Sequence, residues 1–415
     1  MTVVDGEEFS DLLSSLLDVS QRATPGELPD LVRDTTRKLG LLDAVIYLAD
    51  LQQMRLTPLA GVRAGVPAPG AVGGEAAGLA VDGTLAGWAY RTGATELASG
   101  SELVMWVPLV DGAERIGVLR LIAPAMDATT LEQCQSLAAL VAKVVMSKAG
   151  FSDMLLRSIR TQPMTLQAEM AWAFMPPRTI GTRSVTSSAV LEPAYEIGGD
   201  AFDHSLTARS LHVTVVDAMG HDLASGLCAA VALAGCRSTR RSGGDLTDIT
   251  ATVDEALNEW LPERLLTAIF ADLDVETGDL SWVNCGHPAP LLIRRHHVVA
   301  DALRRDAQLP LGINPHHAPR VPNVIHHAQL EPGDRILIHT DGVTEARSDT
   351  GEQFGEERLI DTVVRATAAG EAAPEALRRL VRGILDHHHG HLRDDATILL
   401  AEWHPRSEQT ADSAA

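Results

Sequence analysis

The chain has few cysteines, few aromatic residues and no long hydrophobic run. Its four cysteines include no CxxC pair, which disfavours a zinc site or a disulfide framework and favours reduced, buried thiols. None is followed six positions later by arginine, as a cysteine-nucleophile phosphatase loop requires. The most apolar run, Gly226 to Cys236, is too short to span a bilayer, and the N-terminus lacks the apolar core of a signal peptide. We therefore expect a cytoplasmic protein.

Two further absences narrow the function. No GxxxxGK phosphate loop is present, which disfavours a kinase or an ATPase. Positive charge is scarce: the formal net charge is −21, the pI is about 5.1, and the lysines are limited to Lys38, Lys143 and Lys148. This balance argues against a broad surface for nucleic acid or for an anionic membrane, so we expect neither as a partner.

The first part of the chain has the pattern of a small α+β domain, which we place at residues 1–150. A length of 415 residues allows two or three domains. A glycine- and alanine-rich loop runs from about Gly65 to Gly78, and Asp82 or Thr84 is a candidate cap for a helix across Leu85 to Arg91. Periodicity predicts further helices at 9–17, 31–41 and 130–148, and strands at 44–48, 55–59, 103–109 and 115–121.

This order of elements, together with the segment from Val81 through Trp88 to Gly93, resembles a GAF domain over roughly residues 8–148. The resemblance implies a sensor that binds a small molecule between sheet and loop, or a dimerisation module without a ligand. Both alternatives stay open, because no residue commits the domain to haem, a bilin or a cyclic nucleotide.

Residues 151–178 are expected to form a helical linker in which Pro163 starts a second segment. Leu166, Met170 and Phe174 recur every fourth residue and form one apolar stripe. Such a stripe either packs on its own domain or pairs with a second copy of the chain. The second alternative predicts a homodimer.

From residue 179 to 405 the pattern changes to many strands with two helical interruptions, Leu223 to Cys236 and Leu246 to Leu261. Glu276-Thr277-Gly278 between two strand-like runs indicates a hairpin. Many strands with a few long helices suggest a β-sandwich covered by helices. The polar segment 406–415 is expected to be a disordered tail.

Four short motifs in this second region each carry an aspartate beside a strand-like run or a glycine turn. They contain Asp200, Asp217, Asp341 and Asp394. Separately, each motif has a structural explanation, such as a turn or a strand cap. Together they suggest carboxylates that converge at strand ends, which repel one another unless a cation neutralises them. Oxygen ligands suit Mg²⁺ or Mn²⁺, and four aspartates would balance two divalent ions.

In this order, the motifs resemble the metal-dependent protein phosphatases of the type-2C class (PPM), in particular their bacterial sporulation and stress-response branch. The resemblance covers about Thr182 to Trp403 and includes supporting segments at 192–200, 284–290, 310–312 and 354–359. It implies an αββα sandwich with two Mn²⁺ or Mg²⁺ ions. The overall expectation is thus an α+β chain: a GAF-like domain, a helical linker and a four-layer phosphatase domain.

The resemblance also assigns roles to single residues. Asp217 would bridge two ions and the carbonyl of Ala218 would add a ligand, while Asp341 and Asp394 would hold one ion and Asp200 the other. Water between the ions would attack phosphorus directly, without a phosphorylated protein intermediate. Further positions that match the family near the site, with less certain roles, are Asp203, Asn284 and His287.

The sequence departs from the family pattern at a few positions. Many members have glycine where Asp222 follows His221, so Asp222 either adds charge near the site or, as we favour, caps the next helix. Many also have glycine at Ala218, but a backbone ligand tolerates alanine. Cys285 replaces a frequent alanine, and we expect a packing role there.

Two other interpretations rank lower. Residues 198–202 resemble the GGDEF motif of diguanylate cyclases only in part, because Ala201 replaces an acid. The histidines at 387–389 and 391 occur at a predicted helix end, where imidazoles favour the helix dipole, and adventitious metal binding is the weaker explanation.

The leading hypothesis is a serine/threonine protein phosphatase regulated by its GAF-like domain. By resemblance, its substrate would be a phosphorylated anti-anti-sigma (STAS-domain) protein in a partner-switching pathway. The alternative is a signalling scaffold that uses the phosphatase fold to bind a partner without turnover. The presence of all four carboxylates favours the enzyme.

Overall fold

The computed structural model describes residues 5–62, 78–100, 102–220, 222–313, 323–347, 351–387, 392 and 394–405. Its contacts divide the chain into two compact units, Met1–Pro163 and Met164–Ala415. Each unit is described by itself. The predicted loop over 65–78 falls almost wholly outside the described residues, as do His221, three of the C-terminal histidines and the tail 406–415.

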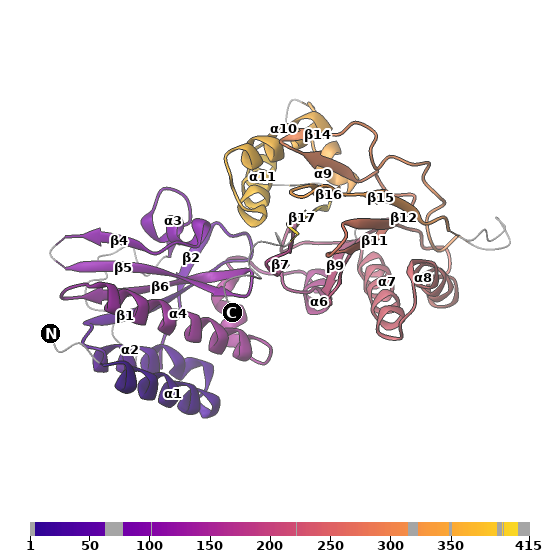
Figure 1. The fold of residues 1–415 in the computed structure, drawn as a ribbon. Helices are drawn as coiled ribbons and strands as arrows, with labels where there is room; N and C mark the ends of the chain where they lie inside the picture. The colour runs from indigo at the N-terminus through magenta and orange to yellow at the C-terminus, as the bar shows by residue number, and fades with distance from the viewer. Residues whose placement is uncertain are drawn as a thin grey trace, which may run out of the picture. The chain divides into compact units, whose positions relative to one another are not determined.

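The first unit contains one antiparallel sheet of six strands in the order β3-β2-β1-β6-β5-β4 (Figure 1). The strands are β1 (Asp43–Ala49), β2 (Arg55–Pro58), β3 (Leu79–Ala80), β4 (Glu96–Ser99), β5 (Leu103–Asp111) and β6 (Glu114–Ala123). The helices are α1 (Gly6–Arg22), α2 (Leu28–Lys38), α3 (Leu85–Thr92), α4 (Ala128–Ala149) and α5 (Asp153–Ile159), with a 3₁₀ turn at Pro25–Glu27.

The two faces of this sheet have separate hydrophobic cores. Helices α1, α2 and α4 contribute residues such as Leu28 and Leu137 to one core, whereas Tyr90 of α3 packs with Tyr47 and Trp106 on the other face. The Thr84 hydroxyl accepts a hydrogen bond from the Gly87 amide at 3.0 Å, so of the two candidate caps it is Thr84 that starts α3.

The division between the units falls inside the predicted linker. Helix α5 packs with the first unit through Leu155, and α6 (Leu166–Phe174) packs with the second through Ala168 and Ala171. The stripe on α6 is largely uncovered, because Leu166 is 68% exposed and Phe174 is 41% exposed. The domain boundaries of the sequence analysis stay predictions.

The second unit contains two antiparallel sheets. One has the order β15-β12-β11-β10-β9 and the other the order β14-β13-β16-β17-β8-β7. The strands are β7 (Thr179–Gly181), β8 (Val185–Glu192), β9 (Asp200–Leu206), β10 (Ser210–Ala218), β11 (Leu266–Asp274), β12 (Asp279–Cys285), β13 (Leu291–Arg294), β14 (His297–Val298), β15 (His326–Gln329), β16 (Arg335–His339) and β17 (Ala396–Trp403). One core, which includes Val215, Ile338 and Leu399, joins residues of both sheets.

Helices pack on the other face of each sheet (Figure 1). Helices α7 (Leu223–Arg241) and α8 (Leu246–Trp260) cover the β10–β11 region around Phe270, and the predicted helices there are confirmed. On the second sheet lie α9 (Asp341–Glu345), α10 (Gly355–Ala368) and α11 (Ala373–His387). The prediction of only two helices in this region was therefore wrong, although Leu377, Leu380 and Ile384 carry the amphipathic spacing of α11.

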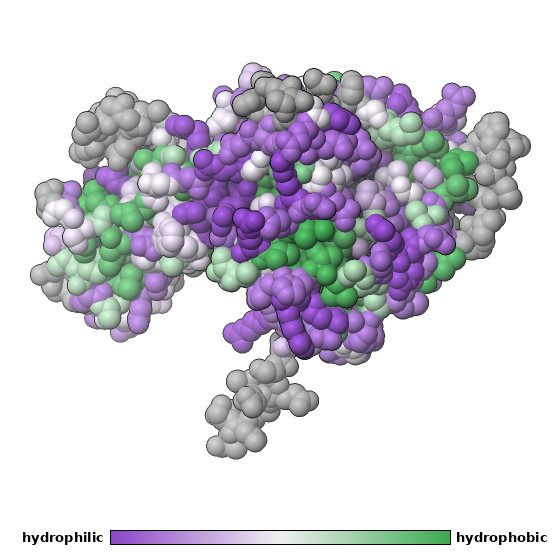
Figure 2. Space-filling view, turned by 90° about the horizontal axis from the view of Figure 1, so that it is seen from above, coloured by the Kyte–Doolittle hydropathy of each residue, from purple (hydrophilic) through white to green (hydrophobic). Residues whose placement is uncertain are grey.

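The surface is mixed in polarity. On the face shown in Figure 2, hydrophilic residues surround several hydrophobic patches. In the described part of the chain, no helix combines the length and the apolar composition that a membrane span requires.

Candidate metal site

The β9–β10 ladder places two of the predicted aspartates opposite each other. Asp200 is the first residue of β9 and pairs with Asp217 near the end of β10. Asp200 is two positions from Phe202 on β9, and Asp217 is two positions from Val215 on β10, so each aspartate lies on the same face of its strand as that residue. Phe202 and Val215 belong to the core shared by the two sheets. The two carboxylates therefore lie on the face of the first sheet that is directed toward the second sheet.

The second sheet brings the other two aspartates to the same region. Asp341 directly follows Thr340 at the end of β16, and Asp394 precedes the start of β17, the strand that pairs with β16. Both residues are exposed. The pKa of Asp217 is raised to about 7, chiefly by burial and then by the negative charges of Asp341 and Asp394. The structure thus gathers the carboxylates that the sequence placed far apart.

Asp200 joins the two sheets. It is 3% exposed, and its Oδ2 accepts hydrogen bonds from the hydroxyls of Thr340 at 2.8 Å and Thr397 at 2.7 Å. Burial raises the pKa of Asp200 well above its usual value, as does the charge of Asp217, although the two hydroxyls oppose this shift. Because Oδ2 faces the threonines, the orientation of this carboxylate is set by the second sheet.

Asp395 is a further acidic residue that the sequence analysis did not assign to the site. Its Oδ2 accepts hydrogen bonds from three successive amides, those of Gly198 (2.8 Å), Gly199 (2.7 Å) and Asp200 (3.1 Å). Burial raises the pKa of Asp395, whereas these amides lower it. The only sequence signal was its position beside Asp394. The carboxylate fixes the turn that carries Asp200.

We expect Asp395→Ala to lower the free energy of unfolding by about 1–3 kcal/mol, because three buried amides lose their acceptor. Urea denaturation of the full chain measures the change. Asp394→Ala is the matched control, since Asp394 is exposed and, among the residues that the structure describes, its side chain accepts a hydrogen bond only from the adjacent Asp395 amide. Equal destabilisation by both substitutions would contradict the role given to Asp395.

Gly199 leaves room for the carbonyl of Ala218. A Cβ at position 199 would lie 2.1 Å from this oxygen, so any side chain there would displace one of the two backbones. The Ala218 amide donates to the Gly199 carbonyl at 3.1 Å, and the Ala218 side chain is buried in the core under α7. This packing explains why alanine is accommodated at 218.

Asp222 caps α7, as we favoured. Its Oδ1 accepts a hydrogen bond from the Ser225 amide at 2.8 Å, and its other oxygen lies 3.2 Å from a guanidinium nitrogen of Arg264. The hydrogen bond from the Ser225 amide, with smaller contributions from the Ser225 hydroxyl and Arg264, lowers the pKa of Asp222. The acidic side chain is thus used locally by the helix terminus and by one arginine.

The three additional family-like positions are structural in this geometry. Asp203 lies on the opposite face of β9 from Asp200 and is paired with Arg237 and Arg240 of α7. Asn284 holds a tight turn through its hydrogen bonds with the backbone of His287, both at 2.8 Å. His287 is buried and its pKa is lowered to about 4, chiefly by burial.

The predicted ligand residues have the side-chain chemistry that a divalent cation requires, but they do not surround a single point in this structure. Among the described residues, no three His, Cys, Asp or Glu side chains are already arranged around one point. Asp217 nevertheless has its pKa raised by burial and by neighbouring carboxylates, so a cation would relieve an existing repulsion. Carboxylates together with one carbonyl are the ligands that Mg²⁺ and Mn²⁺ prefer.

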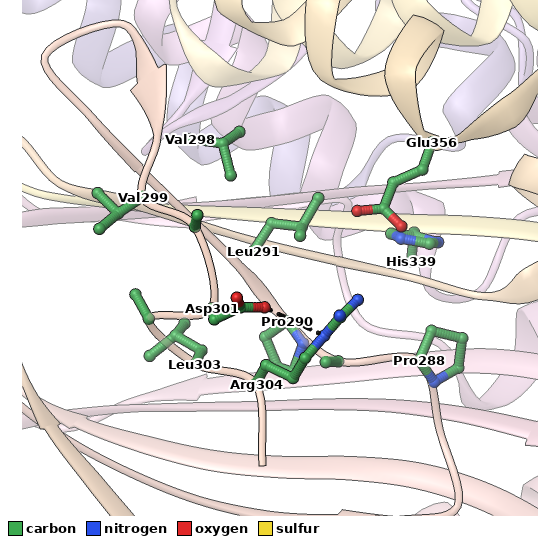
Figure 3. A pocket seen from close by; sticks show the side chains of 13 residues that line it. Pro288, Pro290, Leu291, Val298, Val299, Asp301, Leu303, Arg304, His339 and Glu356 are labelled. Atoms are coloured by element: carbon green, nitrogen blue, oxygen red, sulfur yellow. Dashed lines mark ion pairs between the residues drawn. The ribbon is translucent and has the colours of Figure 1, made fainter. Parts of the chain in front are cut away.

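A separate pocket of about 250 Å³ lies by β13 and the end of β16 (Figure 3). His339 and Glu356 face each other at one side of it, and Asp301 and Arg304 form an ion pair of 3.5 Å at the other. None of the predicted metal ligands lines this pocket. It is therefore distinct from the carboxylate cluster.

Comparison with known proteins relates the second unit to a phosphatase group. Residues 207–404 match the family described as Stage II sporulation protein E (SpoIIE). The phosphoserine phosphatase RsbU of Bacillus subtilis is 20% identical over 216 residues, 51% of this chain and 61% of RsbU. Protein IcfG of a Synechocystis strain is 31% identical over 134 residues, 32% of this chain and 20% of IcfG.

One solved structure that aligns with part of this chain comprises the RsbU and RsbW domains of Rv1364c from Mycobacterium tuberculosis. Its TM-score is 0.44 at 20% identity, with 54% of this chain and 62% of that chain covered. This chain spans about a fifth of IcfG and about three fifths of RsbU.

Proposed function

We propose that this chain is a cytoplasmic, metal-dependent serine/threonine phosphoprotein phosphatase. The observation that carries the proposal is the grouping of Asp217 with Asp341 and Asp394 at one end of two facing sheets, together with the match of residues 207–404 to the SpoIIE family. The fold proposed for the second unit is the αββα sandwich of the PPM phosphatases, and the first unit is proposed to be GAF-like.

The residues of the site have different tasks in this proposal. Asp217, Asp341 and Asp394, with the Ala218 carbonyl, would hold the cations, and bound Mn²⁺ or Mg²⁺ would activate water and offset charge on the phosphoryl oxygens. Asp200 would complete the negative site from a fixed orientation, because Thr340 and Thr397 hold its Oδ2. Asp395 would position Asp200 without contacting the substrate.

The test is hydrolysis of p-nitrophenyl phosphate and of a phosphoserine peptide by the full chain, with Mn²⁺ or Mg²⁺ and with a chelator. We expect hydrolysis that requires the metal. Calorimetry should show uptake of Mn²⁺ by the same preparation. Metal uptake without turnover of either substrate would favour the alternative, a scaffold that binds a phosphoprotein partner. No metal uptake at all would overturn both forms of the proposal.

The proposed physiological substrate is a phosphorylated STAS-domain protein in a partner-switching pathway. Support comes from the relatives, which include the phosphoserine phosphatase RsbU. A phosphoproteome compared with and without the gene would identify the substrate. A small-molecule ligand of the GAF-like unit is a further proposal.

A homodimer is proposed from the exposed apolar residues of α6 and α7. Met170 of α6 lies against Gly226 of α7, where a Cβ at 226 would be 3.0 Å from the Met170 methyl carbon. Beside this contact, the two helices expose large apolar side chains, which we call the α6–α7 patch: Leu166 (68%), Phe174 (41%), Leu223 (47%) and Leu227 (43%). Pairing with a second copy would cover this patch close to the loop that follows Asp217.

We expect Leu166→Asp to weaken dimerisation at least about tenfold, since burial of a leucine at the centre of an interface contributes on the order of 1.5–3 kcal/mol. Light scattering over a micromolar concentration series measures the association. Leu309→Asp is the control, because Leu309 is 60% exposed but lies outside the patch. A monomeric wild-type chain at these concentrations would contradict the proposed dimer.

A further inference from the structure

The outer face of the first sheet changes from apolar to polar beyond the part covered by α7 and α8. Phe270 and Val216 lie under the helices, whereas Asp272, two residues after Phe270 on the same strand, faces a pocket of about 770 Å³. Three arginines from the last turns of α7 form one wall of this pocket: Arg237, Arg240 and Arg241. His212 of β10 also lines it, although only 4% of His212 is exposed.

His212 is held between an acid and a thiol. It pairs with Asp272 across the β10–β11 ladder, and its Nδ1 lies 2.8 Å from the Asp272 carboxylate. On the other side of the ring, Nε2 lies 2.7 Å from the Thr214 hydroxyl and 3.4 Å from Sγ of Cys236. The order of groups from the pocket inward is therefore carboxylate, imidazole and thiol, as in sites where a base activates a cysteine.

The four cysteines differ in this respect although all are buried. In the described part of the chain, Cys236 is the only cysteine hydrogen-bonded to an imidazole. Burial lowers the pKa of His212, but the hydrogen bonds to Asp272 and Cys236 outweigh it and raise this pKa to about 9. For the Cys236 thiol, burial acts to raise the pKa, but the hydrogen bond with His212 outweighs burial and brings this pKa below its usual value. Burial raises the pKa of Cys134 and Cys285 to about 12 and that of Cys228 to about 11.

We propose that Cys236 is a site of oxidative modification by small hydroperoxides, which reach it from the pocket lined by Arg237, Arg240 and His212. The site is separate from the carboxylate cluster. This inference does not depend on the proposed phosphatase activity, because it is tested by the mass of the peptide that contains Cys236.

The reaction balances with the groups present and one hydroperoxide. The Cys236 thiolate attacks the terminal oxygen of R–O–O–H, so that an S–O bond forms while the O–O bond breaks. Sulfur is oxidised by two electrons to the sulfenic acid, and the peroxide is reduced to the alkoxide R–O⁻. The alkoxide takes the proton of the His212 imidazolium and leaves as the alcohol, or as water from hydrogen peroxide.

Access determines the size of the oxidant. Cys236 itself has no exposed surface, and His212 lies between its sulfur and the pocket. A reagent must pass when the ring or the last turn of α7 moves aside, which favours hydrogen peroxide over bulky peroxides.

The experiment treats the native full chain with hydrogen peroxide, traps sulfenic acid with dimedone, and measures each cysteine peptide by mass spectrometry. We expect Cys236 to be labelled before Cys134, Cys228 and Cys285, which serve as internal controls. Labelling of Cys236 no faster than these three would overturn the inference, as would its absence under conditions that label them.

Asp272→Asn tests the activation separately from the access. Without the Asp272 charge, the His212 imidazolium is less stable and the pKa of the Cys236 thiol should rise. A rise of about one unit lowers the thiolate fraction about tenfold, but a thiolate of higher pKa is also more nucleophilic, so the rate of labelling should fall about threefold. Asp279→Asn is the matched control, because Asp279 lines the same pocket without bonding His212. Equal rates in the two variants would contradict the role of Asp272.

Discussion

Asp217→Asn should lower metal-dependent phosphatase turnover by roughly a hundredfold to a thousandfold, the largest effect on activity that we expect from one isosteric substitution. The charges of Asp341, Asp394 and Asp395 all raise the pKa of Asp217, so its carboxylate is close enough to interact with each of them. Asparagine retains the shape of the side chain but removes the charge that a shared cation requires. Steady-state hydrolysis of p-nitrophenyl phosphate with Mn²⁺ measures the loss, and Asp341→Asn should behave similarly.

The free energy of unfolding of Asp217→Asn distinguishes a loss of turnover at the site from a loss caused by misfolding. The pKa of Asp217 is raised to about 7 in the folded chain, chiefly by burial, from the ordinary aspartate value of 3.8. Between these values the folded state binds more protons than the unfolded state, so this group makes the metal-free protein less stable as pH rises. Asp217→Asn removes the effect, and its free energy of unfolding at pH 8 with a chelator should equal or exceed that of the wild type.

Asp306→Asn is the charge-matched control for activity, because Asp306 is exposed and outside the cluster. It should leave turnover unchanged. Full Mn²⁺-dependent activity in Asp217→Asn would refute the assignment of the site.

Gly199→Ala should lower turnover by about a hundredfold, even though it adds only one methyl group. The new Cβ would lie 2.1 Å from the Ala218 oxygen and 2.9 Å from the Gly220 oxygen, so the backbone that follows Asp217 must move. A displacement of about 1 Å at a catalytic group can reduce a rate by this factor. The same shift should weaken Mn²⁺ binding, which calorimetry measures.

Gly383→Ala is the control for the glycine substitution. Gly383 lies within α11, and a Cβ there meets no atom within 4 Å. Alanine should therefore stabilise the helix by up to about 1 kcal/mol and leave turnover unchanged. If Gly199→Ala had wild-type kinetics, the short distance between residue 199 and the Ala218 carbonyl would not be required for activity.

The tertiary structure separates neighbouring acidic residues that look equivalent in the sequence. Asp394 and Asp395 are adjacent, but Asp394 is exposed, whereas Asp395 is buried and accepts hydrogen bonds from three amides. Asp200 and Asp203 lie on one strand, yet only Asp200 faces the second sheet. Side chains three positions apart on a strand point to opposite faces, so strand register decides which carboxylate belongs to the site.

The sequence by itself determined the acidic motifs, the strands that they flank and the helices α4, α7 and α8, because hydrophobic periodicity and turn residues act over a few positions along the chain. Only the tertiary structure decided that Asp395 anchors the turn of Asp200 and that Cys236 lies against His212. These contacts join residues far apart in sequence, and local patterns carry no information about which distant groups the packing of two sheets will bring together.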